Sequence, residues 1–216
     1  MDGSMDFEKC LLELITMQME VLDTLSPEQK AVLILDPSSN ALENETTVRI
    51  IFNSLLESPE EEELEELEEF YEAFVEATEE ENVKVIENPR VRDTMLNLTL
   101  MALAPQFPVF EPSDFALWFQ VNLVVLLASF NPGSLVVIPM NISCDSYHAI
   151  LKGLDQSLAS LPPELTQGIA SSREILIQRV PKGCNEIPVV GECKETPVKE
   201  ASICAEINRC VVCLAI

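Results

Sequence analysis

The chain has 216 residues, 47% of them hydrophobic, so it is long enough to bury a core and too apolar to be disordered throughout. Its net charge is −24, and residues 1–87 contribute 25 acidic side chains against 4 basic ones. Because such a surface repels phosphates, this charge argues against binding to nucleic acids or to anionic membranes.

Helix-start signals recur along the chain in the stretches LSPEQ, ESPEE and ENPRV, which begin at residues 25, 57 and 87. In each, a Ser or Asn can accept a free backbone N–H, and the following proline lacks an N–H that would go unpaired. Together with the apolar spacing, these signals predict helices over 6–24, 27–35, 45–56, 59–80, 89–103, 113–128, 145–159 and 163–178. The β-prone residues Leu135 to Ile138 predict one short extended segment.

Eight helices with short connectors, only 6 glycines and 6% aromatic residues predict an all-α fold. Stacked helix pairs, as in an armadillo-like α-solenoid, would explain the recurring helix starts. An irregular helical array stays open, because the helix interiors do not align. We expect an acidic helical domain over residues 1–180 and a loop-rich, Cys-rich segment over 181–216.

An acidic run spans residues 60–81 and contains 13 glutamates with no basic residue. Apolar residues spaced three and four apart predict one buried face of an amphipathic helix and a solvated anionic face opposite. Docking of a basic partner is one alternative role. Calcium binding is another, but a straight helix does not supply the converging oxygens that calcium needs.

Residues 115–130 form a strongly apolar run of a length that is short for a membrane span, so we expect a buried core helix there and no transmembrane segment. The first residues include Asp2, Asp6 and Glu8, which do not match the basic start of a secretory signal peptide.

Three Asn-x-Ser/Thr sequons predict glycosylation at Asn44, Asn97 and Asn141. Asn97 points away from the apolar face of its predicted helix, while Asn44 and Asn141 lie in or beside connectors. All three are therefore expected to be exposed. The alternative is that they are unmodified polar residues at turns and helix flanks.

Cys10 is most simply a buried thiol on the first predicted helix. The other six cysteines are an even number in the last third of the chain, which predicts disulfides and an oxidising compartment. Their pairing stays open. The candidates are Cys144, Cys184, Cys193, Cys204, Cys210 and Cys213.

Other chemistry finds little support in the sequence. The single C-x-x-C pair, Cys210 and Cys213, lacks the second pair or histidines of a zinc site. The last four residues, CLAI, match a prenylation box on Cys213, but no polybasic stretch precedes them. His148 is the only histidine, and no nucleotide-binding, hydrolase or metalloprotease motif is present. We therefore expect no enzyme activity, no cofactor and no metal.

The stretches NISCDSYHAILKGLDQSL and NPRVRDTMLNLTLMALAPQFPVFEPSDFALWFQVNLVVLLASFNPGSLVVIP resemble modules of large extracellular fish proteins. They also resemble, more distantly, the mesothelin, stereocilin and otoancorin family. The resemblance covers about residues 25–180 and implies armadillo-like helix pairs, glycosylated ectodomains and roles in adhesion between cells or between cell and matrix.

Two hypotheses about function follow. The first is a non-catalytic, extracellular or cell-surface glycoprotein that binds a protein or glycoprotein partner in cell adhesion. The second is a cytoplasmic acidic helical adaptor with reduced cysteines, a basic partner and a prenyl group on Cys213. The binding partner and the oligomeric state are not predicted.

Overall fold

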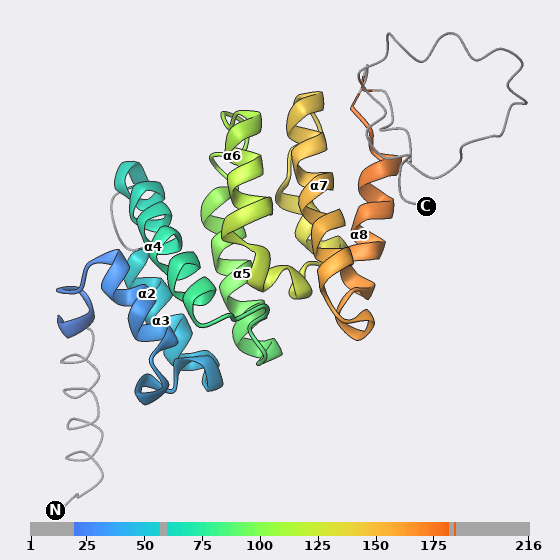
Figure 1. Cartoon of the computed structure of the whole chain (residues 1–216). Coiled ribbons are helices and arrows are strands. Elements are labelled where there is room, and N and C mark those ends of the chain that lie inside the picture. Colours follow the sequence, from blue (N-terminus) through green and yellow to red (C-terminus); the bar gives the residue numbers. More distant parts are fainter. Residues whose placement is uncertain (1–19, 57–59, 182–183, 185–216) are drawn as a thin grey trace, which may run out of the picture. The chain divides into compact units, whose positions relative to one another are not determined.

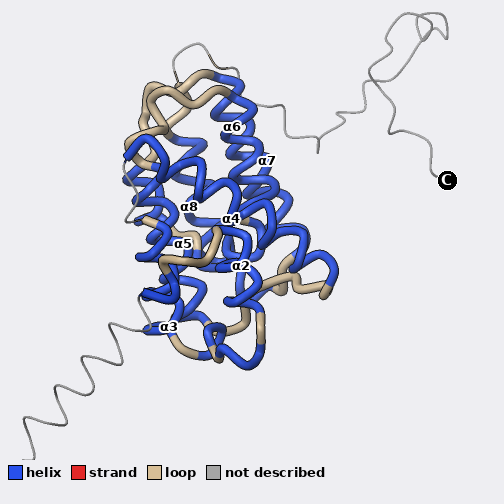
Figure 2. Tube along the Cα trace, turned by 90° about the vertical axis from the view of Figure 1, so that its left-hand side faces the viewer, coloured by secondary structure: helices blue, strands red, loops and turns tan. Residues whose placement is uncertain are grey.

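The computed structural model describes residues 20–56, 60–181 and 184 of the chain. The chain divides into two units, Met1–Asn185 and Glu186–Ile216, and the second unit lies outside the described residues. The described residues form helices joined by loops, with no strand among them (Figure 2). The predicted all-α class is thereby confirmed for this part of the chain.

Helices of three kinds follow one another along the described chain (Figure 1). The α-helices are α2 (Pro27–Leu35), α3 (Glu45–Leu55), α4 (Glu60–Glu80), α5 (Pro89–Leu103), α6 (Pro112–Leu117), α7 (Cys144–Ser160) and α8 (Gln167–Gln178). Shorter 3₁₀ helices are η1 (Pro37–Ser39), η2 (Ala41–Glu43), η4 (Val124–Ser129), η5 (Pro132–Val137) and η6 (Pro163–Leu165), and η3 (Trp118–Asn122) is a π-helical turn.

Two predicted helix starts have the cap that their sequence indicates. Ser26 accepts a hydrogen bond from the Gln29 backbone N–H, and the Gln29 side chain accepts one from the Ser26 N–H, which makes a full capping box. Asn88 Oδ1 accepts from the N–H groups of Arg90 and Val91 at the start of α5. The start predicted at ESPEE falls on residues 57–59, which lie outside the described part.

The single helix predicted over residues 113–128 is wrong. α6 ends at Leu117, and the chain continues as the π-helical turn η3 and the 3₁₀ helix η4. Most large side chains of this run are buried, including Trp118, Phe119 and Leu126, which have no exposed surface. A straight helix would distribute these side chains around its axis, whereas the changes in pitch turn them toward the core.

The extended segment predicted at Leu135 to Ile138 is also wrong, because residues 132–137 form the 3₁₀ helix η5. Asn131 Oδ1 accepts from the Gly133 N–H, and Pro132 occupies the first helical position. Helix-start signals therefore outweigh the β-propensity of the four apolar residues.

Some helices pack on the next α-helix in the chain, and others pack on the α-helix after that. α2 packs on α4, α3 packs on α5, and α6 packs on α7 (Figure 1). Each of α2 and α4 also contacts the helix that follows it, and α8 contacts α7, η4 and η5. Most described helices therefore bury side chains against more than one neighbour.

Aromatic side chains connect these helices at the centre of the core. Tyr71 on α4 lies edge to face with Trp118 on η3, their ring centroids 5.3 Å apart, and Phe70 lies 5.1 Å from Phe52 on α3. All four have essentially no exposed surface. Edge-to-face pairs of this kind add to the stabilisation that burial itself provides.

Candidate functional site

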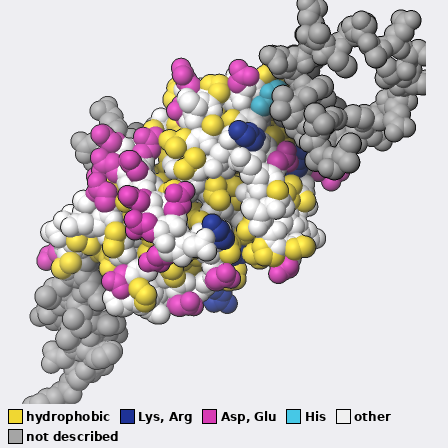
Figure 3. Space-filling model, in the orientation of Figure 1, with side chains coloured by type: hydrophobic (Ala, Val, Ile, Leu, Met, Phe, Trp, Pro, Cys, Tyr) yellow, Lys and Arg dark blue, Asp and Glu magenta, His cyan; other side chains and the backbone are white. Residues whose placement is uncertain are grey.

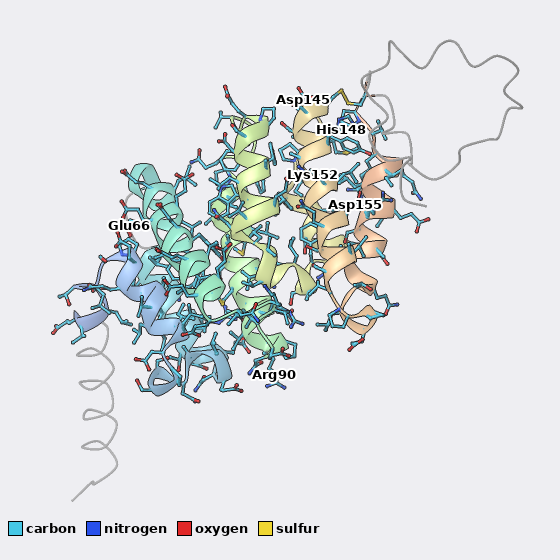
Figure 4. The ribbon with its side chains drawn as sticks, viewed as in Figure 1. Glu66, Arg90, Asp145, His148, Lys152 and Asp155 are labelled. Atoms are coloured by element: carbon cyan, nitrogen blue, oxygen red, sulfur yellow. A yellow bond between two sulfur atoms is a disulfide. The ribbon has the colours of Figure 1, made fainter. Side chains whose placement is uncertain are left out.

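The N-terminal end of α7 holds the residues that the sequence singles out most strongly. Within about ten residues it combines a sequon at Asn141, a helix cap at Ser143, a cysteine at position 144 and His148. Figure 4 labels His148 on α7. Ser143 Oγ accepts a hydrogen bond from the Ser146 N–H and so begins the helix. The cap at Ser143 therefore sets where α7 begins and so where these residues lie.

Cys144 and Cys184 form a disulfide, with their Cα atoms 5.3 Å apart. Cys144 is the first residue of α7, and Cys184 lies beyond α8, so the bond joins the start of one helix to the chain that leaves the next. This supplies one pairing for the six candidate cysteines. Cys10, Cys193, Cys204, Cys210 and Cys213 lie outside the described residues.

His148 is half-buried on α7, and its ring lies 5.5 Å from that of its neighbour Tyr147. Its Nε2 atom is buried and has no hydrogen-bond partner. Within the described residues, no three His, Cys, Asp or Glu side chains gather to hold a metal ion.

All three sequon asparagines are exposed, as their positions in the sequence indicate. Asn44 caps α3 through Oδ1, which accepts from the Thr46 N–H at 2.9 Å. A glycan attaches to Nδ2, so this cap is compatible with modification.

The sequon at Asn97 differs from the other two because Thr99 is fully buried inside the fold. Its hydroxyl lies 2.6 Å from the Tyr71 hydroxyl, and it donates to the Met95 carbonyl. An enzyme that reads the Thr99 hydroxyl can therefore reach it only before the chain folds.

A groove lies between the connector before α6 and the connector before α7, and we call it the α6–α7 groove. Its volume is about 390 Å³, and Asn141 is part of its lining. The other lining residues are Phe107, Pro108, Phe110, Glu111, Pro112, Pro139, Ile142, Ser143 and Ser146. The sequon asparagine therefore lies in the lining of an open depression that exposes both polar and apolar groups.

α4 is amphipathic, as its sequence predicts, with Leu67, Tyr71 and Phe74 fully buried. Acidic side chains gather over this helix on the face shown in Figure 3. The ion pairs of the described residues are Glu45–Arg49 and Asp155–Arg173, and neither involves α4.

The electrostatic consequence is visible at Glu68, whose pKa is raised. Partial burial is the largest cause, and the neighbouring charges of Asp114 and Glu65 add to it. The anionic face of α4 therefore extends toward the start of α6, and like charges repel one another across it.

No protein-family model, curated protein or solved structure matches this chain. Among the described helices, none is long and apolar enough to cross a membrane.

The sequence does not indicate the α6–α7 groove, because the stretch PQFPVFEP at residues 105–112 by itself predicts only a short connector between two helices. Its composition held a signal, since two phenylalanines in an eight-residue connector must either be buried or line a surface. Which of these occurs depends on the connector that lies opposite.

Proposed function

We propose that this chain belongs to a non-catalytic extracellular or cell-surface glycoprotein that binds a protein or glycoprotein partner in cell adhesion. The observation that supports this most directly is the Cys144–Cys184 disulfide, three residues from the exposed sequon residue Asn141. Disulfides persist in oxidising compartments, and N-glycans are attached in the secretory pathway. The disulfide and the sequon, which both indicate the secretory pathway, therefore lie together at the N-terminal end of α7.

We infer that the helices form stacked pairs of the armadillo-like α-solenoid type. The packing of α2 on α4 and of α3 on α5, with contacts inside the pairs α2–α3 and α4–α5, supports this arrangement. Similar contacts continue from η3 and η4 to α7 and α8. Stacked pairs create extended surfaces on which a partner can lie.

The resemblance to the mesothelin, stereocilin and otoancorin family is part of the same proposal. One residue step that carries the resemblance is N-I-S-C, residues 141–144, where an exposed sequon asparagine precedes a bonded cysteine. A glycosylation sequon next to a disulfide-bonded cysteine is consistent with a module of an extracellular domain.

The acidic face of α4 indicates what kind of partner to expect. Its exposed glutamates include Glu65, Glu69 and Glu72, and none forms an ion pair within the described residues. A partner surface with Lys and Arg side chains would relieve the repulsion and accelerate the encounter. Increasing salt should weaken such binding.

The test is to express the chain in animal cells behind a supplied signal peptide and to purify what is secreted. We expect a mass decrease on glycosidase treatment and a Cys144–Cys184 linked peptide in a non-reducing digest. The same digest after reduction should yield the two peptides separately, which serves as the control.

Secreted protein without sugar at any sequon and with every thiol free would contradict the proposal. An added prenyl group on Cys213 after expression in the cytosol would instead support the cytoplasmic adaptor.

A further inference from the structure

Asn141 lines the α6–α7 groove, and this places any sugar on its side chain at the groove's edge. The groove has a volume of about 390 Å³, which falls within the range of about 300–1,000 Å³ usual for small-ligand sites. Asn141 itself is exposed, as a glycosylated asparagine must be.

The apolar part of the groove is preformed. The rings of Phe107, Phe110 and Phe115 lie about 5.6 Å from one another in a three-ring cluster, and Phe107 and Phe115 are buried. The cluster fixes Phe110, which is half-buried and lines the groove. Its surface therefore needs no rearrangement to accept a ligand.

The lining of the groove combines apolar and polar groups. Prolines 108, 112 and 139 and the half-buried Phe110 belong to its apolar part. The hydroxyl groups of Ser143 and Ser146 stand 2.8 Å apart on the α7 side, where both residues line the groove. An amphipathic ligand with an apolar face and hydroxyl or amide groups at its edge suits this lining.

We propose that the α6–α7 groove holds the first N-acetylglucosamine of a glycan linked to Asn141. The carbon–hydrogen face of the sugar ring packs on Phe110 and the prolines, and its hydroxyl and acetamido groups face the exposed Ser143. This inference rests on the proposed function, because it requires that the chain passes through the secretory pathway.

The covalent link removes most of the cost of binding. Nδ2 of Asn141 displaces the lipid diphosphate from C1 of the donor sugar and loses one proton, so the sugar is then tethered beside its site. A tethered group occupies a weak site that it would not fill from solution, because its effective concentration is high. The sugar on Asn141, bound in the groove, would thus hold the connector before α7 in place.

Proton NMR on secreted protein tests this directly. The chain is produced with high-mannose glycans and trimmed with an endoglycosidase that leaves one N-acetylglucosamine on each modified asparagine. We expect the sugar protons at Asn141 to shift upfield and to show nuclear Overhauser effects to Phe110. Asn44 caps α3 through its Oδ1 atom and is not part of the α6–α7 groove, so a sugar on its Nδ2 atom serves as the internal control.

A second measurement uses thermal unfolding. Removing the sugar with Asn141→Gln should lower the melting temperature by about 2–4 °C, while trimming to a single sugar should leave it unchanged. Phe110→Ala should abolish the difference between sugar-bearing and sugar-free protein, because it removes the packing surface.

The outcomes separate the two proposals. If mass spectrometry finds no sugar on Asn141, both the binding of a sugar in the groove and the proposed glycosylation at this position are contradicted. If Asn141 carries a sugar whose proton signals match those of the exposed sugar at Asn44, binding of the sugar in the groove is contradicted, but glycosylation at Asn141 is not.

Discussion

Buried polar side chains join segments that lie far apart in the sequence. Arg92 on α5 is 5% exposed, and it donates from Nη1 to the Ile86 carbonyl at 2.7 Å and from Nε to Ser129 Oγ at 2.9 Å. Burial lowers its pKa, although Asp93 and Glu87 act in the opposite direction. The guanidinium therefore holds the loop after α4 and the end of η4 against one helix.

Replacing Arg92 with methionine tests this role. We expect Arg92→Met to lower the free energy of unfolding by about 2–4 kcal/mol, because two hydrogen bonds from a charged group are lost and a carbonyl is left unsatisfied. The exposed Arg90 on the same helix is the matched control, and Arg90→Ala should stay within about 0.5 kcal/mol of the unmodified chain. Urea unfolding measures both, and equal stability of the two variants would contradict the assigned role.

Glu68 should make stability depend on pH. Its folded-state pKa is raised by partial burial and by Asp114 and Glu65, so the folded chain binds a proton more readily than the unfolded chain. Its charge therefore costs stability above the raised pKa, and that cost disappears as the pH falls toward the ordinary glutamate pKa.

The variant Glu68→Gln should consequently be more stable than the unmodified chain at pH 7. Because Glu68 is exposed and solvent screens its charge, we expect a gain of no more than about 0.5 kcal/mol, which should vanish near pH 4. Thermal unfolding at several pH values measures it. Glu164→Gln changes the net charge equally at an exposed position away from α4, so it separates the local effect from the global one. A gain that does not change with pH would contradict this account.

At the scale of elements, close backbone approach decides where α7 lies. Gly153 is buried in α7, and a methyl group at this position would stand 2.4 Å from the Phe119 carbonyl oxygen on η3. The backbone of the π-helical turn η3 therefore packs directly against Gly153. A residue with any side chain would separate α7 from the turn.

Gly153→Ala should therefore destabilise the chain by about 1–3 kcal/mol, even though alanine is the better helix former by about 1 kcal/mol. Gln156→Ala provides the control at an exposed position of the same helix, where only the propensity changes. Circular dichroism during urea unfolding measures the difference. If Gly153→Ala were stabilising, α7 and η3 could not be in the contact described.

The C-terminus of α4 shows the same dependence on backbone geometry. Asn82 adopts a left-handed conformation with φ of 54°, and the Val83 N–H then donates to the Thr78 carbonyl at 2.8 Å. Asparagine tolerates this conformation better than most residues. The acidic helix therefore has a defined stop, which its sequence of repeated glutamates does not indicate by itself.

At the scale of the whole molecule, the Cys144–Cys184 disulfide closes a loop over α7 and α8, with a separation of 40 residues. A closure of this length is worth about 2–4 kcal/mol, through the reduced freedom of the unfolded chain. The bond therefore ties Cys184, which follows α8, to the first residue of α7.

We expect Cys144→Ala, Cys184→Ala and the double variant to lose similar stability, because each breaks the same bond. Chemical unfolding of the oxidised protein gives the three values. Treating the unmodified protein with a reductant should shift it toward the variants. A double variant that loses the sum of the two single losses would show that the cysteines act separately.

The sequence by itself determined the helical class, the capped starts of α2 and α5 and the amphipathic character of α4. These features depend on residues within one or two turns of each other, so local spacing and cap chemistry specify them. The exposure of the three sequon asparagines followed from the same local reasoning.

Only the tertiary structure decided the partner of Cys144, the break of the run after Leu117 and the groove beside Asn141. Each of these depends on residues brought together from distant parts of the chain. A buried run adjusts its pitch to the surfaces that cover it, and a groove exists only between two connectors, so neither can be read from one segment alone.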